Sequence, residues 1–303
     1  MEEEEIEYQD PINGNERLDL IEYVCDRKET VIGHLATASD YLYEVKSREL
    51  LYCAVPGTSS GFMLRVLAIA SNADDTNIPQ LGDSLKSKEL KDLGVSRVSS
   101  EELSPYKAEA FFLRTLEYHK FIFVRNPYSR ILSIYLKEFS PTRKTQKEKN
   151  VALIKQIQNL NGIESNSNSN SSVTFKEFLT FVLDTATWQS GFFWRPVFDA
   201  CAPCNMNYDF VGKMETFEVD FESEKTAIYD NAESTVKVII NSVLEEIDKL
   251  HTNFDSHWKT IPLEMVQRFI KAYKMDFQAF GYVTPLQLYL DNPDWLKEGK
   301  EKI

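Results

Sequence analysis

Residues 120–139 read KFIFVRNPYSRILSIYLKEF, and this stretch decides the fold that we expect. Residues 121–124 form a short apolar run of the kind found in buried parallel strands. Asn126 and Pro127 interrupt the run, and apolar residues then recur at helical spacing from Ile131 onward. The stretch therefore predicts a strand, a tight turn and a helix.

Two arginines and a serine flank the predicted turn. Arg125 follows the strand at its carboxyl end, which is where open α/β sheets bind ligands. Arg130 and Ser133 are three residues apart and so share one face of the helix. Guanidinium groups beside a helix N-terminus suit a phosphate, because both offer N–H donors and positive charge. The alternative is that both arginines are surface charges paired with carboxylates.

A second unit of the same kind lies upstream, in residues 50–69. Residues 50–55 form another apolar run, residues 56–61 are a loop of small residues with the sequence PGTSSG, and helical spacing follows. The N–H groups and hydroxyls of such a loop can bind an anion, although the lysine and the spacing of a Walker loop are missing. The alternative is a plain turn.

These two units and two later segments resemble the four signature blocks of one enzyme family. The blocks are YCAVPGTSSGFMLRVL, KFIFVRNPYSRILSIY, RPVFDACAPCNMNYDFVGKMET and YKMDFQAFGY. They are similar, in the same order, to the blocks of the Golgi carbohydrate sulfotransferases that include chondroitin 4-O- and HNK-1 sulfotransferases. The resemblance implies an α/β fold with a central parallel sheet and flanking helices, of the P-loop-like sulfotransferase type. It also implies a 3′-phosphoadenosine 5′-phosphosulfate (PAPS) donor and transfer of a sulfuryl group to a glycan acceptor.

The resemblance also carries site residues with it. In that family the second block binds the 3′-phosphate of PAPS through an arginine and a serine, which correspond to Arg125 and Ser133. The first block binds the 5′-phosphosulfate. The donor-binding residues that we expect are therefore Gly57, Thr58, Ser59, Ser60, Gly61, Arg65, Arg125, Arg130 and Ser133.

The first block departs from the family pattern at two positions. Gly57 stands where the family has a lysine, and Gly61 stands where it has a hydroxyl residue. Removing a charged donor of this kind typically raises the barrier by about 2.7–4 kcal/mol. Two functions therefore stay open: an active PAPS-dependent carbohydrate sulfotransferase, or an inactive relative that binds nucleotide or glycan or serves as a partner subunit. If the chain is active, we expect Gly57→Lys to raise turnover. Arg65 and Lys213 are the candidates for a replacement cation.

Two residues are candidates for the general base. Glu215 follows a third predicted strand at residues 208–212, so it could take the proton of the acceptor hydroxyl. His119, just before the central strand, is the second candidate. The alternatives are that Glu215 and Lys213 are solvated or paired with neighbours and that His119 is a partly buried structural residue.

Length and charge limit the remaining choices. The chain has 303 residues and a net charge of −13, which argues against nucleic acid and anionic membrane surfaces as partners and favours a neutral or weakly charged glycan. We expect a flexible acidic tail at residues 1–16, a single domain at residues 17–290 with a flexible Asn/Ser-rich insertion at about residues 140–172, and a polar tail at residues 291–303.

The sequence gives no sign of a membrane anchor. No run reaches the roughly 18–20 apolar residues of a span, and no signal peptide opens the chain. The family resemblance implies the Golgi lumen. Without an anchor, the alternatives are a fragment, a soluble form or a cytoplasmic protein.

The four cysteines are Cys25, Cys53, Cys201 and Cys204. Their even number is compatible with lumenal disulfides but does not require them. Cys201 and Cys204 form a C-x-x-C pair that lacks the second ligand pair of a zinc site and the following helix of a redox motif. We therefore expect no metal at this pair, and its resemblance to the C-x-P-C of the family's third block implies a structural role.

Other segments predict helices. These are residues 17–29, residues 173–184 with a cap from Thr174 and Glu177, residues 227–250 and residues 262–280, with His251 and His257 in the last connection. The aromatic residues at 188–196 either line a sugar site or cover the core, and we favour the core.

Overall fold

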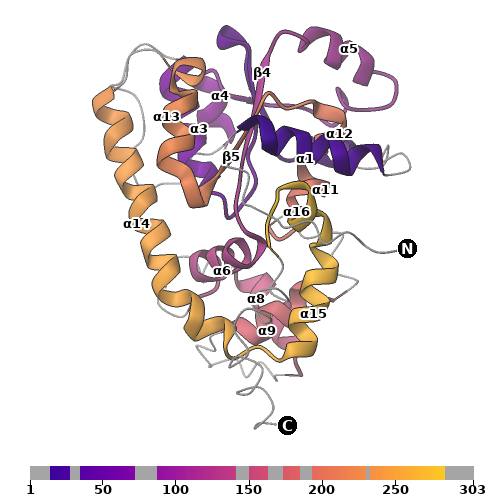
Figure 1. Cartoon of the computed structure of the whole chain (residues 1–303), viewed down its shortest axis with the longest axis vertical. Helices are drawn as coiled ribbons and strands as arrows, with labels where there is room; N and C mark the ends of the chain where they lie inside the picture. Colours follow the sequence, from indigo (N-terminus) through magenta and orange to yellow (C-terminus); the bar gives the residue numbers. More distant parts are fainter. Residues whose placement is uncertain are drawn as a thin grey trace.

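The computed structural model describes residues 14–27, 35–71, 87–140, 150–162, 173–184, 193–229 and 233–283. In these residues five strands form one sheet in the order β3-β1-β2-β4-β5. Figure 1 shows β4 and β5 among the surrounding helices. The strands are β1 (Leu42–Val45), β2 (Leu50–Cys53), β3 (Ser96–Arg97), β4 (His119–Val124) and β5 (Phe210–Lys213).

The centre of the sheet is parallel, as the sequence predicts. β4 lies between β2 and β5 and pairs with both in parallel register, with Cys53 opposite Ile122 and Val124 opposite Lys213. The remaining pairs are antiparallel, because β1 runs against both β2 and β3. The α/β class is therefore confirmed, whereas the sheet as a whole is mixed. The sequence analysis missed β1 and β3, which have only four and two residues.

Helices cover both faces of the sheet, since successive strand side chains point to opposite sides. On one face, Ile122 and Val211 join a core with α1 (Gly14–Asp26), α2 (Leu35–Ala38), α5 (Ala108–Arg114), α6 (Pro127–Glu138), α8 (Val151–Leu160), α9 (Phe175–Val182), α11 (Val197–Cys201), α12 (Pro203–Met206), α15 (Leu263–Ala272) and α16 (Lys274–Ala279). On the other, Phe121 and Phe123 pack with α3 (Ser60–Ser71), α4 (Ser87–Asp92), α13 (Phe217–Ile228) and α14 (Glu233–Trp258).

The strand–turn–helix unit of residues 120–139 is present as predicted. Asn126 is the N-cap of α6, and its side chain accepts a hydrogen bond from the N–H of Tyr128. Pro127 occupies the first turn of α6, where its missing N–H costs no helical hydrogen bond. The unit places the N-terminus of α6 directly at the carboxyl end of β4.

The insertion at residues 140–172 is more ordered than we expected. Its residues 150–162 include helix α8, which buries Ile157 in the core. Residues 141–149 and 163–172 lie outside the described residues. The next predicted helix is confirmed as α9, which starts with a capping box formed by Thr174 and Glu177. Apolar contacts of α8 therefore outweigh the polar composition around it.

Three further expectations concern the C-terminal half and the tails. His251 and His257 belong to the long helix α14 rather than to a connection. Residues 1–13 and 284–303, which include most of the N-terminal tail and the whole C-terminal tail that we expected, lie outside the described residues. Residues 14–16 of the expected N-terminal tail begin helix α1 instead.

Two disulfides join distant parts of the chain. Cys53, at the end of β2, pairs with Cys201 of α11, and Cys25 of α1 pairs with Cys204 of α12. The C-x-x-C pair is therefore divided between two structural cross-links, which confirms the structural role. A cross-link of this kind typically stabilises a protein by about 2–4 kcal/mol.

The described ranges also bear on membranes and metals. None of their helices combines the length and the apolar character needed to cross a bilayer. Within the same ranges, no three His, Cys, Asp or Glu side chains gather as metal ligands do.

Candidate active site

The loop after β2 forms the first wall of the site. Thr58 turns its hydroxyl back to the carbonyl of Val55, at 2.8 Å, which closes the turn. The carbonyl of Ser59 accepts from the N–H groups of Phe62 and Met63, and α3 begins at Ser60. The free N–H groups of this 12-residue helix therefore lie at the carboxyl edge of the sheet, where an anion is favoured.

Arg125 connects this loop to the second unit. Its side chain is 1% exposed, and Nη2 donates to Oγ of Ser59 at 3.4 Å. Nη1 lies 3.7 Å from Oε1 of Glu246 on α14, and Ser133 of α6 donates to that same oxygen at 3.4 Å. Burial lowers the pKa of the Arg125 guanidinium, and the carboxylates of Glu246 and Glu215 oppose that shift. The structure therefore brings Ser59, Arg125 and Ser133 together, as the sequence predicts.

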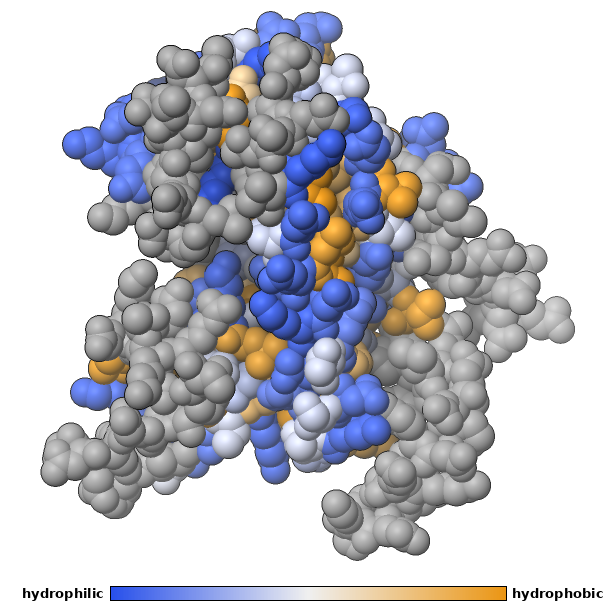
Figure 2. Space-filling view, turned by 90° about the vertical axis from the view of Figure 1, so that its left-hand side faces the viewer, coloured by the Kyte–Doolittle hydropathy of each residue, from blue (hydrophilic) through white to orange (hydrophobic). Residues whose placement is uncertain are grey.

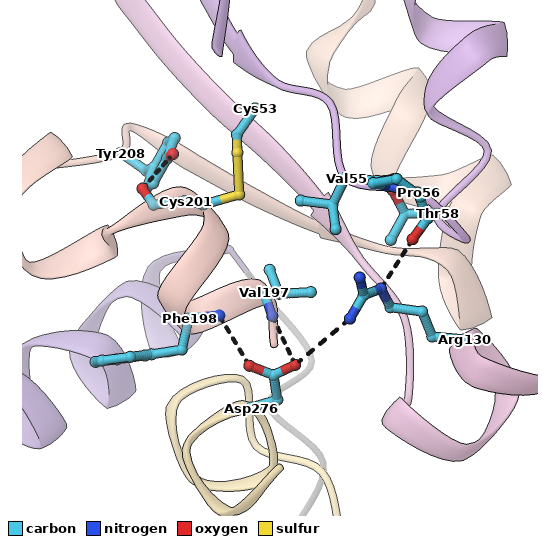
Figure 3. The surroundings of a disulfide bond; sticks show 10 residues. All are labelled: Cys53, Val55, Pro56, Thr58, Arg130, Val197, Phe198, Cys201, Tyr208 and Asp276. Atoms are coloured by element: carbon cyan, nitrogen blue, oxygen red, sulfur yellow. Dashed lines mark hydrogen bonds and ion pairs between the residues drawn. A yellow bond between two sulfur atoms is a disulfide. The ribbon is translucent and has the colours of Figure 1, made fainter. Parts of the chain in front are cut away.

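Arg130 has a different place from the one we expected. Its side chain is buried beneath the loop, where Nε donates to the carbonyl of Pro56 at 2.9 Å and Nη2 to the carbonyl of Phe193 at 3.2 Å. Its Nη1 lies 4.0 Å from Asp276, and Figure 3 shows this contact next to the Cys53–Cys201 disulfide. Because these protein groups engage its guanidinium, Arg130 positions the loop rather than presenting a free cation.

Asp276 completes the support beneath the loop. Its two carboxylate oxygens accept from the N–H groups of Val197 and Phe198, which open α11, at 2.8 Å each (Figure 3). Burial raises the pKa of Asp276 to about 7, although Arg130 and the two N–H donors act in the opposite direction. The fourth signature block is thus connected to the first through Asp276 and Arg130.

Glu215 lies at the carboxyl ends of β4 and β5. One carboxylate oxygen accepts from the N–H of Asn126 at 2.8 Å, and the other accepts from the hydroxyl of Tyr282 at 3.0 Å. Lys213 is buried next to it, with Nζ 3.4 Å from the carbonyl of Gly281 and 4.6 Å from the centre of the Tyr282 ring. Glu215 is therefore held in a defined position beside Arg125, while Lys213 packs against residues 281–282.

His119 does not lie in this site. It begins β4, whereas Arg125 follows the last residue of that strand, so the two residues lie at opposite ends of the sheet. Its Nε2 pairs with Glu224 of α13 at 2.8 Å. His119 is therefore a structural residue at the amino ends of the parallel strands, and our interpretation of it as a candidate general base is wrong.

The conformation of Gly57 contradicts the expected gain from a lysine. The residue has a φ of +84°, and a Cβ atom there would lie 2.8 Å from Cγ and 3.0 Å from the carbonyl oxygen of Arg130. Left-handed backbone costs a residue with a side chain about 1–2 kcal/mol, and overpacking adds about 1–3 kcal/mol. We therefore expect Gly57→Lys to lower the free energy of unfolding by about 2–5 kcal/mol, measured in urea, and to lower turnover.

Gly61 provides a matched control for that substitution. It lies in the same loop-to-helix segment, has no positive φ, and a Cβ atom there would meet no atom within 4 Å. The free energy of unfolding of Gly61→Lys should lie within about 1 kcal/mol of the wild-type value, since an exposed substitution away from special features has little effect. A Gly57→Lys variant as stable as Gly61→Lys would show that the loop can take another conformation.

Three residues of this region escaped the sequence analysis: Tyr282, Glu246 and Asp276. A signal exists for Asp276, an acidic residue among the aromatic residues of the fourth block. Glu246 gives no signal, because an acidic residue on an amphipathic helix is ordinary. Among the aromatic residues at 188–196, Trp194 packs against Phe178 and Phe181 in the core, as we favoured, and Trp188 and Phe192 lie outside the described residues.

Comparisons with known proteins place these features in a family. The sulfotransferase family model matches residues 40–283, a range that contains all four blocks. Carbohydrate sulfotransferase 11 of Rattus norvegicus is 28% identical over 268 residues, which cover 86% of this chain and 70% of the relative. Carbohydrate sulfotransferase 14 of Homo sapiens is 27% identical over 262 residues, covering 86% and 62%. No solved structure matches the chain. By the match over most of its length, this chain belongs to the sulfotransferase family.

Proposed function

We propose that this protein is a carbohydrate sulfotransferase that transfers a sulfuryl group from PAPS to a hydroxyl of a glycan. The observation that carries the proposal is the position of the buried Arg125. Its guanidinium donates to Ser59 of the first loop and shares a carboxylate oxygen of Glu246 with Ser133. The names of its relatives, carbohydrate sulfotransferases 11 and 14, support a glycan as the acceptor.

Arg125 and Ser133 are assigned to the 3′-phosphate of the donor. A buried guanidinium binds a phosphate strongly, because its parallel N–H donors match two phosphate oxygens. The hydroxyl of Ser133 adds a third donor from α6. The N–H groups at the start of α3, with residues 57–61, are assigned to the 5′-phosphosulfate, since they lie one strand away at the same edge of the sheet.

Glu215 is assigned as the general base. In the reaction the acceptor oxygen forms a bond to sulfur, and the bond from sulfur to the phosphate oxygen breaks with its electron pair staying on the phosphate. The acceptor hydroxyl loses its proton to the carboxylate of Glu215. The N–H of Asn126 and the hydroxyl of Tyr282 hold that carboxylate in place beside the donor site.

The two disulfides support an oxidising compartment. Disulfides persist in the secretory lumen and are rare in reducing compartments. Together with the resemblance to Golgi enzymes, the Cys25–Cys204 and Cys53–Cys201 pairs favour the Golgi lumen as the place of action.

Calorimetric titration with 3′-phosphoadenosine 5′-phosphate (PAP), the product of the donor, tests the assignment. We expect the wild type to bind PAP and Arg125→Ala to bind it about 30-fold or more weakly, because removing one partner of a buried charged contact costs about 2–5 kcal/mol. Ser133→Ala should weaken binding by up to about tenfold.

Arg97→Ala is the matched control, since Arg97 is an exposed arginine on the edge strand β3. It should bind PAP as the wild type does. If a folded wild type binds no PAP, or if Arg125→Ala binds it with unchanged affinity, the proposed donor site is wrong. Transfer of radiolabelled sulfate from PAPS to glycans, starting with neutral or weakly charged ones, then identifies the acceptor.

A further inference from the structure

A carboxylate from α14 lies against the proposed 3′-phosphate site. α14 runs along one side of the molecule past α3 and α6 (Figure 1). Seen from that side, the described surface carries mostly hydrophilic side chains, with smaller apolar areas between them (Figure 2). Glu246 is one of the acidic residues of α14, and its side chain reaches Arg125 and Ser133.

The contacts of Glu246 are those expected of a phosphate oxygen. A single oxygen, Oε1, lies 3.7 Å from Nη1 of Arg125 and accepts from Oγ of Ser133 at 3.4 Å. Both side chains are thus engaged by one anionic oxygen, which is the role assigned above to the 3′-phosphate. A phosphate and a carboxylate cannot occupy the same space, so donor binding requires this carboxylate to move.

The geometry also shows that the carboxylate can leave. Both distances exceed the roughly 2.7–2.9 Å of a strong charged hydrogen bond, and Nη1 of Arg125 is buried without a hydrogen-bond partner among the described residues. The Glu246 side chain is 42% exposed and can turn into solvent. Arg125, in contrast, is 1% exposed and fixed.

Glu246 differs from the other titratable groups near Arg125. Glu215 and Tyr282 also influence the guanidinium, but the hydroxyl of Tyr282 donates to the carboxylate of Glu215, which also accepts from the N–H of Asn126. Glu246 is the acidic residue that contacts both Arg125 and Ser133. Glu246 therefore occupies the position assigned to the 3′-phosphate, whereas Glu215 acts on Arg125 only through its electrostatic field.

We infer that Glu246 is an internal competitor of the donor 3′-phosphate, and that it sets the affinity and the selectivity for 3′-phosphorylated nucleotides. Without donor, its carboxylate offsets the buried charge of Arg125. With donor, its displacement lowers the net gain from the 3′-phosphate. The inference rests on the proposed function, because it concerns the same donor site.

Titration of the full chain with two nucleotides tests the inference. PAP carries the 3′-phosphate, and adenosine 5′-phosphosulfate lacks it. We expect Glu246→Gln to bind PAP about five- to tenfold more tightly than the wild type and to bind adenosine 5′-phosphosulfate with unchanged affinity. Gln keeps the length of the side chain and an acceptor for Ser133, so the change isolates the charge.

Glu245→Gln is the matched control. Glu245 is the neighbouring residue on α14, is 71% exposed and pairs with Lys249 in solvent. It should bind both nucleotides as the wild type does. The inference is overturned if Glu246→Gln binds PAP no more tightly than the wild type, or if both nucleotides gain equally. If a folded wild type binds no PAP, or if Arg125→Ala binds it as tightly as the wild type does, the proposed function fails as well.

Discussion

Glu215→Gln is expected to lower the rate of sulfuryl transfer by about 100- to 10,000-fold, which is the usual contribution of a general base. Glutamine fills the same space and can still accept from the N–H of Asn126, but it cannot take the proton of the acceptor hydroxyl. The affinity for PAP should stay close to that of the wild type, because the carboxylate of Glu215 acts on Arg125 only through space and, unlike Glu246, does not occupy the position assigned to the 3′-phosphate. The measurement is radiolabelled sulfate transfer to an acceptor that the wild type uses.

Two further variants separate catalysis from charge. Glu218→Gln removes an exposed carboxylate from the first turn of α13, three residues away, and should leave the rate unchanged. Tyr282→Phe removes one hydrogen bond to Glu215 while keeping the ring over Lys213, and should lower the rate less than Glu215→Gln does. Transfer at the wild-type rate by Glu215→Gln would mean that another group takes the proton.

Asp276→Asn is expected to lower the free energy of unfolding by about 3–5 kcal/mol at neutral pH. Changing one member of a buried polar network has this cost, because one of the two oxygens that accept from Val197 and Phe198 becomes an N–H₂ donor while Arg130 stays buried. Arg130 would lose its nearby carboxylate, and the amide N–H₂ of Asn would face a donor at the start of α11. Urea unfolding monitored by circular dichroism measures the change. The exposed Asp255, which pairs with Lys259, is the control, and Asp255→Asn should unfold like the wild type.

The same substitution has a pH signature. Burial raises the pKa of Asp276 from 3.8 to about 7, so between these values the folded protein holds one proton more than the unfolded chain. The contribution of this group to stability is therefore complete below about pH 4 and is lost as the pH rises through about 7. The difference between wild type and Asp276→Asn should grow as the pH falls from about 7 to about 5. A constant difference would mean that Asp276 is ionised throughout.

Local sequence determines the parts of the fold that could be predicted. The apolar run, the Asn-Pro break and the helical spacing of residues 120–139 specify β4, its turn and α6 within a single stretch. The same holds for β2 with α3 and for the capping box of α9. Because parallel strands end at one edge, Ser59, Arg125 and Ser133 could be brought together without knowledge of the other contacts.

The remaining features depend on contacts between distant residues. Arg130 was expected to face the phosphate because it shares a helix face with Ser133, but Asp276, 146 positions later, and the carbonyl of Pro56 hold it beneath the loop. The role of Glu246 depends on how α14 crosses α6, which helical spacing does not reveal. The left-handed backbone of Gly57 is likewise a property of the packed loop. Comparison with the family's first block showed only that a lysine is missing at this position.

The disulfides impose an order on how the chain matures. Each links a cysteine near the N-terminus with one beyond residue 200, across 148 and 179 residues. During synthesis, Cys25 and Cys53 therefore emerge long before either native partner exists, and a disulfide between these two residues at that stage would be non-native. A chain that takes this pairing must exchange it before β2 can be joined to α11. Native cross-linking of this enzyme is thus a late event, and its yield depends on thiol–disulfide exchange in the compartment where it folds.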